Sequence, residues 1–159
     1  MSLYKTFKTN ESYETEGIWL EYGYLDDDES KPIRIKIARA GGQNKAFAKA
    51  LEKATKPHRK ALQAGMLDDR VADRLYKGVF AETVVLDWMN VTDPDGNLLE
   101  FTQENVLKVF NDLPDLFVDL REQASSAALF RDEIRQADLG NSGRSSSTDS
   151  SKGQSNKKS

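Results

Sequence analysis

The sequence predicts an α+β fold that is predominantly helical, with an N-terminal antiparallel β-hairpin packed on a bundle of about four to five helices. Three observations lead to this prediction. Apolar and polar residues alternate within residues 18–37, whereas apolar residues recur every three or four positions in several later segments. The chain has 159 residues, which fits one domain and leaves no room for a second sizeable core.

Two short alternating segments predict the hairpin, because successive side chains of a strand point to opposite faces. Their apolar members are Ile18, Leu20, Tyr22 and Tyr24 in the first segment and Ile33, Ile35 and Ile37 in the second. The connection, residues 26–32, begins with four consecutive acidic residues and is too polar to be buried. Gly41 and Gly42 are expected to end the second strand.

Helical periodicity follows the two glycines. Residues 45–56 predict an amphipathic helix with lysines opposite its apolar side, and Pro57 interrupts it before a short helical piece that ends at Gln63. Residues 70–89 are expected to form the core helix of the domain, capped by Asp68 or Asp69, because apolar side chains surround most of it.

The remaining elements are predicted from capping and turn signals. Residues 93–96 (DPDG) have the composition of a type I turn, and Thr102 can cap a helix through Phe110. Pro114 can open a last helix that continues to Ile134. The apolar seam of that helix comprises Leu113, Phe117, Leu120, Ala124, Ala127 and Ile134.

Composition divides the chain into residues 1–139, expected to form a single globular domain, and residues 140–159, expected to be a disordered tail rich in Ser, Gly and Lys. The tail has no large apolar residue, so it cannot bury enough surface to offset its ordering entropy. It has four basic residues and one acidic residue, although the whole chain has a net charge of -3. The globular part is therefore the acidic part.

Catalytic and metal-binding signatures are weak. The chain has no cysteine and a single histidine, His58, which excludes disulfides, thiolate metal sites and multi-histidine clusters. Residues 93–104 place oxygen ligands at positions one, three, five and twelve of an EF-hand loop, but Leu98 stands where that loop requires glycine. Nucleophile-elbow, dinucleotide-binding and phosphate-loop motifs do not occur. We therefore expect no enzymatic activity, no cofactor and no bound metal.

Several segments of the sequence are similar to the sequences of a known family. Residues 37–47 (IARAGGQNKAF), 56–62 (KPHRKAL) and 79–88 (VFAETVVLDW) resemble the tail assembly chaperones of long-tailed bacteriophages (siphophages). The similarity continues in residues 95–97, 101–105 and 113–117, and extends over about residues 15–125. These segments are typical of the family and contain no catalytic signature.

The resemblance implies a chaperone that binds the phage tape measure protein, keeps it soluble, and helps tail tube subunits polymerise around it. It implies action in the cytoplasm of the infected host and absence from the mature virion. The sequence has no signal core and no apolar stretch that could span a membrane, and it lacks a strongly basic balance, so neither membrane nor nucleic acid is an expected partner. Self-association is left open. A structural virion component, such as a neck or tail-completion protein, and a small enzyme or RNA-binding regulator are the alternative classes.

Two groups of residues are candidate contact sites for a partner. The first lies on the apolar side of the last helix and comprises Phe117, Leu120, Phe130 and Ile134. The second is a basic face, which could contact an acidic surface or RNA, and comprises Lys45, Lys49, Lys53 and Lys56. Ordinary core packing explains the first group equally well, and a solvated helix face explains the second.

The family is also known for a longer product made by programmed ribosomal frameshifting, whose second domain recruits tail tube protein. Residues 151–153 (SKG) can be encoded as TCA-AAG-GGN, which contains the slippery heptamer A-AAG-GGN. A flexible polar joint would let two such domains act independently. A solubilising tail explains the same composition.

Overall fold

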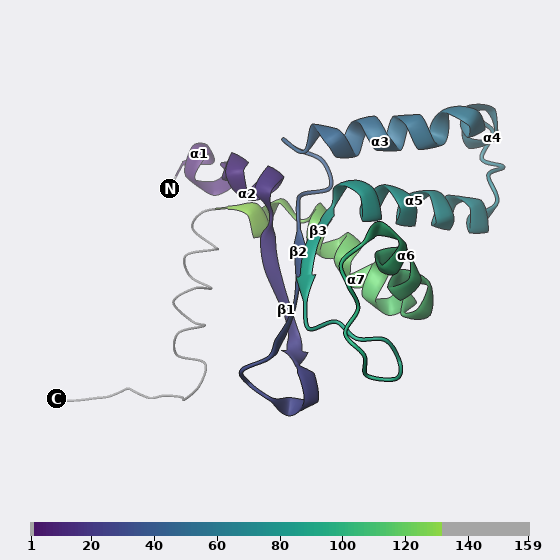
Figure 1. Ribbon diagram of the computed structural model, residues 1–159. Helices are drawn as coiled ribbons and strands as arrows, with labels where there is room; N and C mark the ends of the chain where they lie inside the picture. The colour runs from purple at the N-terminus through teal and green to yellow at the C-terminus, as the bar shows by residue number, and fades with distance from the viewer. Residues whose placement is uncertain (1, 132–159) are drawn as a thin grey trace.

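The computed structural model describes residues 2–131 as a three-stranded antiparallel sheet of order β1-β2-β3 with helices packed against one face (Figure 1). Helices predominate, so the predicted α+β fold is confirmed. The strands are β1 (Ile18–Tyr24), β2 (Pro32–Ile37) and β3 (Val85–Met89). The α-helices are α1 (Leu3–Phe7), α2 (Glu11–Glu16), α3 (Lys45–Thr55), α4 (Arg59–Gln63), α5 (Asp69–Thr83), α6 (Gln103–Asp112) and α7 (Pro114–Ser125). Short 3-10 turns are η1 (Leu25–Asp27), η2 (Lys56–His58) and η3 (Ala127–Phe130).

The predicted hairpin is present and its apolar face is as predicted over most of its length, but Tyr24 lies beyond a register shift in β1 and is 42% exposed. Ile18 pairs with Ile37 across β1 and β2, and both side chains are buried. On the opposite face Arg34 forms an ion pair with Glu21 at 2.8 Å. The polar connection between the strands is exposed, as its composition requires.

The prediction of one continuous helix over residues 70–89 is wrong. Helix α5 ends at Thr83, and residues 85–89 form β3, in which Val85 lies opposite Ile37 and Trp88 opposite Ile35. The hydrogen bonds that β2 offers along its second edge favour a strand here, and a short apolar run with adjacent β-branched residues fits a strand as well as a helix.

The last helix is also shorter than predicted. Helix α7 ends at Ser125, Ser126 is extended, and a 3-10 turn follows over Ala127–Phe130. Backbone amides from distant segments explain the break, because Ala40 N–H donates to the Ala124 carbonyl at 2.9 Å and Asn10 N–H donates to the Phe130 carbonyl at 2.7 Å. Ile134 and the predicted tail, residues 140–159, lie outside the described residues.

Capping side chains begin the helices where the sequence predicts. The Asp68 carboxylate accepts a hydrogen bond from Arg70 N–H at 2.8 Å at the start of α5. Thr102 Oγ1 accepts one from Asn105 N–H at 3.0 Å at the start of α6. Each satisfies a backbone donor that has no partner within its own helix.

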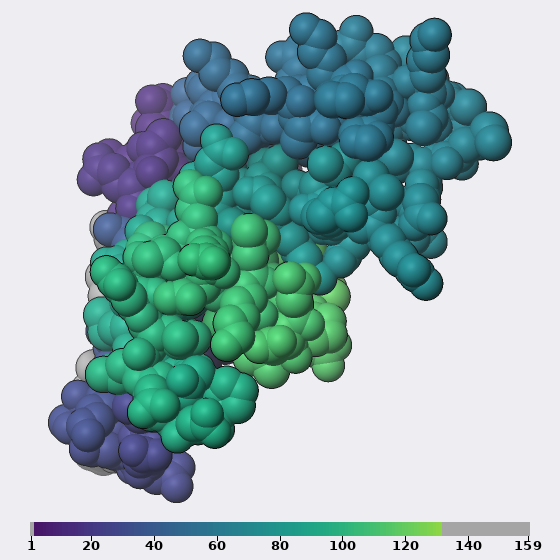
Figure 2. Space-filling model, turned by 45° about the vertical axis from the view of Figure 1, so that its right-hand side comes forward, coloured from purple at the N-terminus to yellow at the C-terminus, as the bar shows by residue number. Residues whose placement is uncertain are grey.

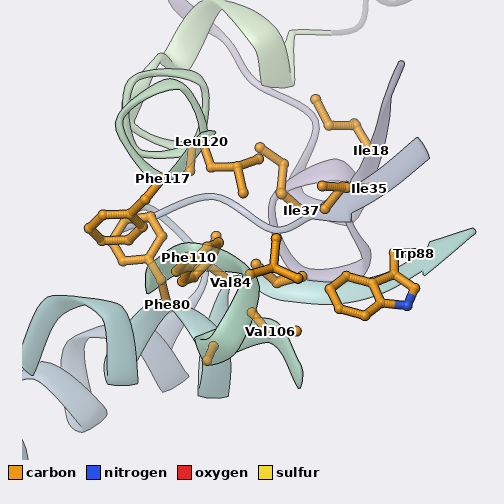
Figure 3. Packing of buried hydrophobic residues seen from close by; sticks show 14 of the residues in the cluster. Ile18, Ile35, Ile37, Phe80, Val84, Trp88, Val106, Phe110, Phe117 and Leu120 are labelled. Atoms are coloured by element: carbon orange, nitrogen blue, oxygen red, sulfur yellow. The ribbon is translucent and has the colours of Figure 1, made fainter. Parts of the chain in front are cut away.

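The core lies between the sheet and helices α5, α6 and α7 (Figure 3). Phe80 of α5 meets the ring of Phe117 of α7 edge to face at 5.5 Å, and Phe110 of α6 lies 4.8 Å from Phe117. The Tyr22 hydroxyl donates to Asp119 Oδ2 at 2.6 Å and ties β1 to α7. Burial, together with the Asp119 carboxylate, raises the pKa of Tyr22 far above its ordinary value.

Helices α3 and α5 run side by side in opposite directions and meet at α4, so that residues 45–83 form a helical arm (Figure 1). The inner half of the arm contacts the core: the Phe47 ring packs edge to face on the buried Phe80 at 5.7 Å, and Lys77 Nζ donates to Asn111 Oδ1 of α6 at 3.1 Å. Figure 2 shows the arm standing out from the rest of the molecule.

Candidate partner-binding surfaces

The predicted contact residues of the last helix are in the core. Phe117 is 2% exposed, Leu120 is 1% exposed and Phe130 is fully buried, so their packing is that of interior side chains. A partner could reach them only if α7 and the following turn moved away from the sheet. Ile134 lies outside the described residues, so its predicted contact role stays a prediction.

The solvent-facing side of α7 consists of different residues. Val118, Arg121, Glu122 and Ser125 follow the helical repeat and line a shallow hollow of about 370 Å³. The Arg121 guanidinium stacks over the ring of Tyr76 of α5, 5.0 Å from its centroid, and so joins α7 to the arm. This side of α7 is mixed in charge and only weakly apolar.

The predicted basic face is exposed along α3. Lys45, Lys49, Lys53 and Lys56 all point into solvent, and within residues 2–131 none of them forms an ion pair within 4.0 Å. Lys45 Nζ donates to the Gly42 carbonyl at 3.2 Å. The structure thus presents this face to a partner, although its contact role is still a prediction.

A buried amide fixes the start of α3. The Asn44 side chain is 6% exposed and donates to the carbonyl of Arg39 at 2.8 Å and to that of Thr83 at 3.0 Å. These bonds join the residue that precedes the arm to Thr83 at the end of α5, so the lysine face has a defined orientation relative to α5.

A buried carboxylate holds the loop that precedes α3. Glu14 of α2 is 1% exposed and accepts hydrogen bonds from the Arg39 guanidinium at 3.0 Å, from Gln43 N–H at 2.9 Å and from the Thr9 hydroxyl. Burial raises the pKa of Glu14, but the hydrogen bonds from these three donors outweigh it and hold the pKa below its ordinary value of 4.5. Glu14 is therefore charged at neutral pH and acts as an anchor for the arm.

The N-terminal helix α1 is an exposed apolar element that the sequence analysis missed. Leu3, Tyr4 and Phe7 are 76%, 84% and 63% exposed, and α1 has no buried residue. Two features of the sequence could have predicted this helix. Ser2 is a capping residue, and its hydroxyl accepts a hydrogen bond from Lys5 N–H. Leu3 and Phe7 are four residues apart, as on one side of a helix. Helix α2 was missed as well, although Asn10 caps it and Gly17 ends it.

A second hollow, of about 290 Å³, lies beside the turn at residues 93–96. It is mostly apolar, and its rim includes Leu113, which is 54% exposed, while the neighbouring Leu98 is 66% exposed. The lining residues are Thr92, Asp93, Pro94, Leu99, Lys108, Val109, Asp112 and Leu113.

The turn itself has the predicted geometry. The Asp93 carboxylate accepts from Asn97 N–H and Asp95 N–H, both at 2.9 Å, and the hydrogen bond from Asn97 lowers its pKa. Gly96 N–H donates to the Asp93 carbonyl at 3.0 Å and closes the turn, and Gly96 leaves it with a positive φ of 89°, which glycine adopts without strain. This carboxylate is therefore engaged by the backbone of its own turn.

The described residues offer surfaces for binding and no cluster suited to metal chemistry. Within residues 2–131, no group of three His, Cys, Asp or Glu side chains is arranged to hold a metal ion. In the same range, no helix combines the length and apolar character needed to cross a bilayer.

Comparison with known proteins places the chain in a family. A family model described as YdaY prophage protein matches residues 42–141, which is more than half of the chain. The chain belongs to the YdaY prophage protein family. Its membership makes it a phage protein, and the match to the YdaY model begins at the end of the hairpin and continues through the arm, β3, α6 and α7. No curated protein and no solved structure matches the chain.

Proposed function

We propose that the protein is a tail assembly chaperone, which binds the tape measure protein of its phage and keeps it soluble until the tail tube polymerises around it. The phage family supports this proposal, and so does the resemblance of residues 37–47, 56–62 and 79–88 to such chaperones. An elongated helical client exposes apolar stripes, and a small domain that covers them would prevent aggregation.

The exposed apolar side of α1 is the observation on which the proposal depends. Three large apolar side chains, Leu3, Tyr4 and Phe7, are mostly exposed on a helix that has no buried residue, and Phe7 packs one face of its ring against Arg131 at 5.5 Å. Burying one such side chain against a client stabilises the complex by roughly 1.5–3 kcal/mol. Binding of this size is reversible, as a chaperone that is released during tail assembly requires.

Co-expression with the tape measure protein tests the proposal. The soluble fraction of the client is measured with the wild-type chain, with a Leu3→Ser/Phe7→Ser variant and with a Tyr24→Ser/Leu98→Ser control, which removes two exposed apolar side chains that line neither hollow. We expect the wild type and the control to keep the client soluble and to copurify with it, and the α1 variant to lose most of this effect. A client that precipitates equally with and without the wild-type chain would overturn the proposal.

We propose further that a minority of ribosomes produce an extended form, in which a second domain contacts tail tube protein. The support is the coding potential of residues 151–153, which lie outside the described residues. The gene sequence tests it. A slippery heptamer over these codons, followed by a long open minus-one frame, is expected, and the extended form is excluded if that frame closes within a few codons.

A further inference from the structure

The arm concentrates positive charge. Between residues 45 and 74 the chain has eight lysine or arginine residues and four acidic residues, although the net charge of the whole chain is -3. All eight basic side chains are exposed: Lys45, Lys49, Lys53, Lys56, Arg59, Lys60, Arg70 and Arg74. The charge is therefore available at the surface.

Only four acidic residues, Glu52, Asp68, Asp69 and Asp73, lie within residues 45–74, so this segment keeps a net charge of +4. The four consecutive acidic residues at 26–29 are in the β1–β2 connection, at the opposite end of the molecule from the arm (Figure 1). This separation gives the arm a positive field of its own. A partner with negative charge would be attracted to the arm specifically.

The spacing of the lysines fits a helix. Successive lysines of this face are separated by four, four and three residues. Each turn of α3 therefore carries one lysine (Lys45, Lys49 and Lys53), and Lys56 is the residue that follows the helix. At a rise of about 1.5 Å per residue, the series spans about 16 Å. A facing helix with carboxylates at the same repeat could place one opposite each lysine.

Apolar side chains continue this surface at the tip of the arm. Leu62 of α4 is 44% exposed and Met66, just beyond α4, is 78% exposed. A partner that is acidic along one side and apolar along the next would be complementary to both parts.

Features of the arm favour a protein over a nucleic acid. Binding of single strands uses free aromatic rings on which bases stack. Two aromatic rings of the arm already have partners, because Phe47 packs on Phe80 and one face of the Tyr76 ring stacks against the Arg121 guanidinium.

We propose that the arm formed by α3, α4 and α5 docks an acidic amphipathic helix of the client protein, with the lysines of α3 facing its carboxylates and Leu62 and Met66 facing its apolar side. This inference rests on the proposed function and extends it, because it specifies the charge that the client segment must have.

Fluorescence anisotropy with synthetic helical peptides tests the proposal on the full chain. The probe has Glu at i, i+4, i+8 and i+11 and Leu on the adjacent side, and its matched control has Gln in place of Glu. We expect the Glu peptide to bind with a Kd at least about tenfold lower than the Gln peptide, and binding to weaken as salt is raised. Equal binding of the two peptides would overturn the proposal.

A charge-matched pair of variants locates the contact. One variant replaces Lys45, Lys49, Lys53 and Lys56 by Gln, and the control replaces four exposed lysines elsewhere, Lys5, Lys8, Lys31 and Lys108, by Gln. We expect only the first variant to lose at least about tenfold in affinity, with an unchanged thermal melt. Equal loss in both variants would show a nonspecific charge effect and overturn the proposal. Displacement of the peptide by oligouridylate RNA or phosphatidylglycerol vesicles at lower concentration than by unlabelled peptide would also overturn it.

The same variants in the co-expression experiment separate this proposal from the function itself. Client kept soluble by the wild type but not by the α3 variant supports both. Client kept soluble equally by both chains overturns the docking proposal and leaves the chaperone function intact. Client that the wild type does not keep soluble overturns the function, and the peptide titration then decides the docking proposal alone.

Discussion

Removing the carboxylate of Glu14 should destabilise the protein strongly. The Glu14 side chain joins α2 to the loop before α3 through Arg39, Gln43 and Thr9. Glu14→Ala leaves the partly buried Arg39 guanidinium and the Gln43 amide without their acceptor. Both groups then have no compensation for the water that they lost on folding.

The size of the effect follows from the burial of the pair. Breaking a buried ion pair by removing one partner costs about 3–5 kcal/mol, whereas Glu14→Gln keeps one acceptor oxygen and should cost about 1–3 kcal/mol. A domain of this size has a total stability of roughly 5–15 kcal/mol, so the alanine variant loses a large part of it. Gly42→Ala should act similarly, because a Cβ at Gly42 would lie 2.0 Å from Glu14 Oε1.

Urea unfolding at pH 7, followed by circular dichroism, measures these differences. With a slope of about 1–3 kcal/mol per molar urea, a loss of about 3–5 kcal/mol in Glu14→Ala should lower the midpoint by about 1–5 M. Glu16→Ala is the matched control, because Glu16 is exposed at the end of the same helix. A Glu14→Ala midpoint equal to that of the control would refute the anchoring role.

The same carboxylate makes stability depend on pH. The folded-state pKa of Glu14 is lower than its ordinary value of 4.5, so its contribution is complete above that value and is lost as the pH falls below it. The free energy of unfolding of the wild type should therefore fall more steeply below pH 4.5 than that of Glu14→Gln. Parallel pH profiles for the two proteins would contradict this assignment.

Three further changes test the packing. Phe80→Ala removes the ring between Phe47 and Phe117 and should cost about 3–5 kcal/mol in urea unfolding, whereas Phe80→Leu should cost less than half of that. Thr102→Ala removes the cap of α6 and should lower stability by about 0.5–2 kcal/mol, with Thr102→Ser restoring most of it. Val85→Asp places an unpaired charge at a position that is 3% exposed, so its thermal melt should lose cooperativity, and an unchanged melt would show that β3 is not in the core.

Local patterns were sufficient for the hairpin, for α3 and for the helix caps. Alternation of the Ile33–Ile37 segment and the caps at Asp68 and Thr102 depend on neighbouring residues only, and these predictions are confirmed. The strand after α5 depends instead on the free edge of β2, which is about fifty residues away in the sequence. The pattern of residues 84–89 contains no sign that they pair with β2.

The candidate contact residues show a second limit of prediction from sequence. An apolar seam looks the same in a sequence whether it faces the core or a partner, and the seam at Phe117 and Leu120 faces the core. The lysines of α3 could be assigned to the surface, since burial of four charges without partners would be too costly. The exposed helix α1 escaped notice because five residues are too few to establish a period.

Electron microscopy of lysates from a prophage that lacks this gene tests the chaperone function most directly, with the gene supplied from a plasmid as the control. We expect capsids without tails in the deletion lysate, and tails of normal length when the wild-type gene is restored. Tails of normal length without the gene would contradict the chaperone function. Complete tails lying free beside filled capsids would instead indicate a structural component that joins the two.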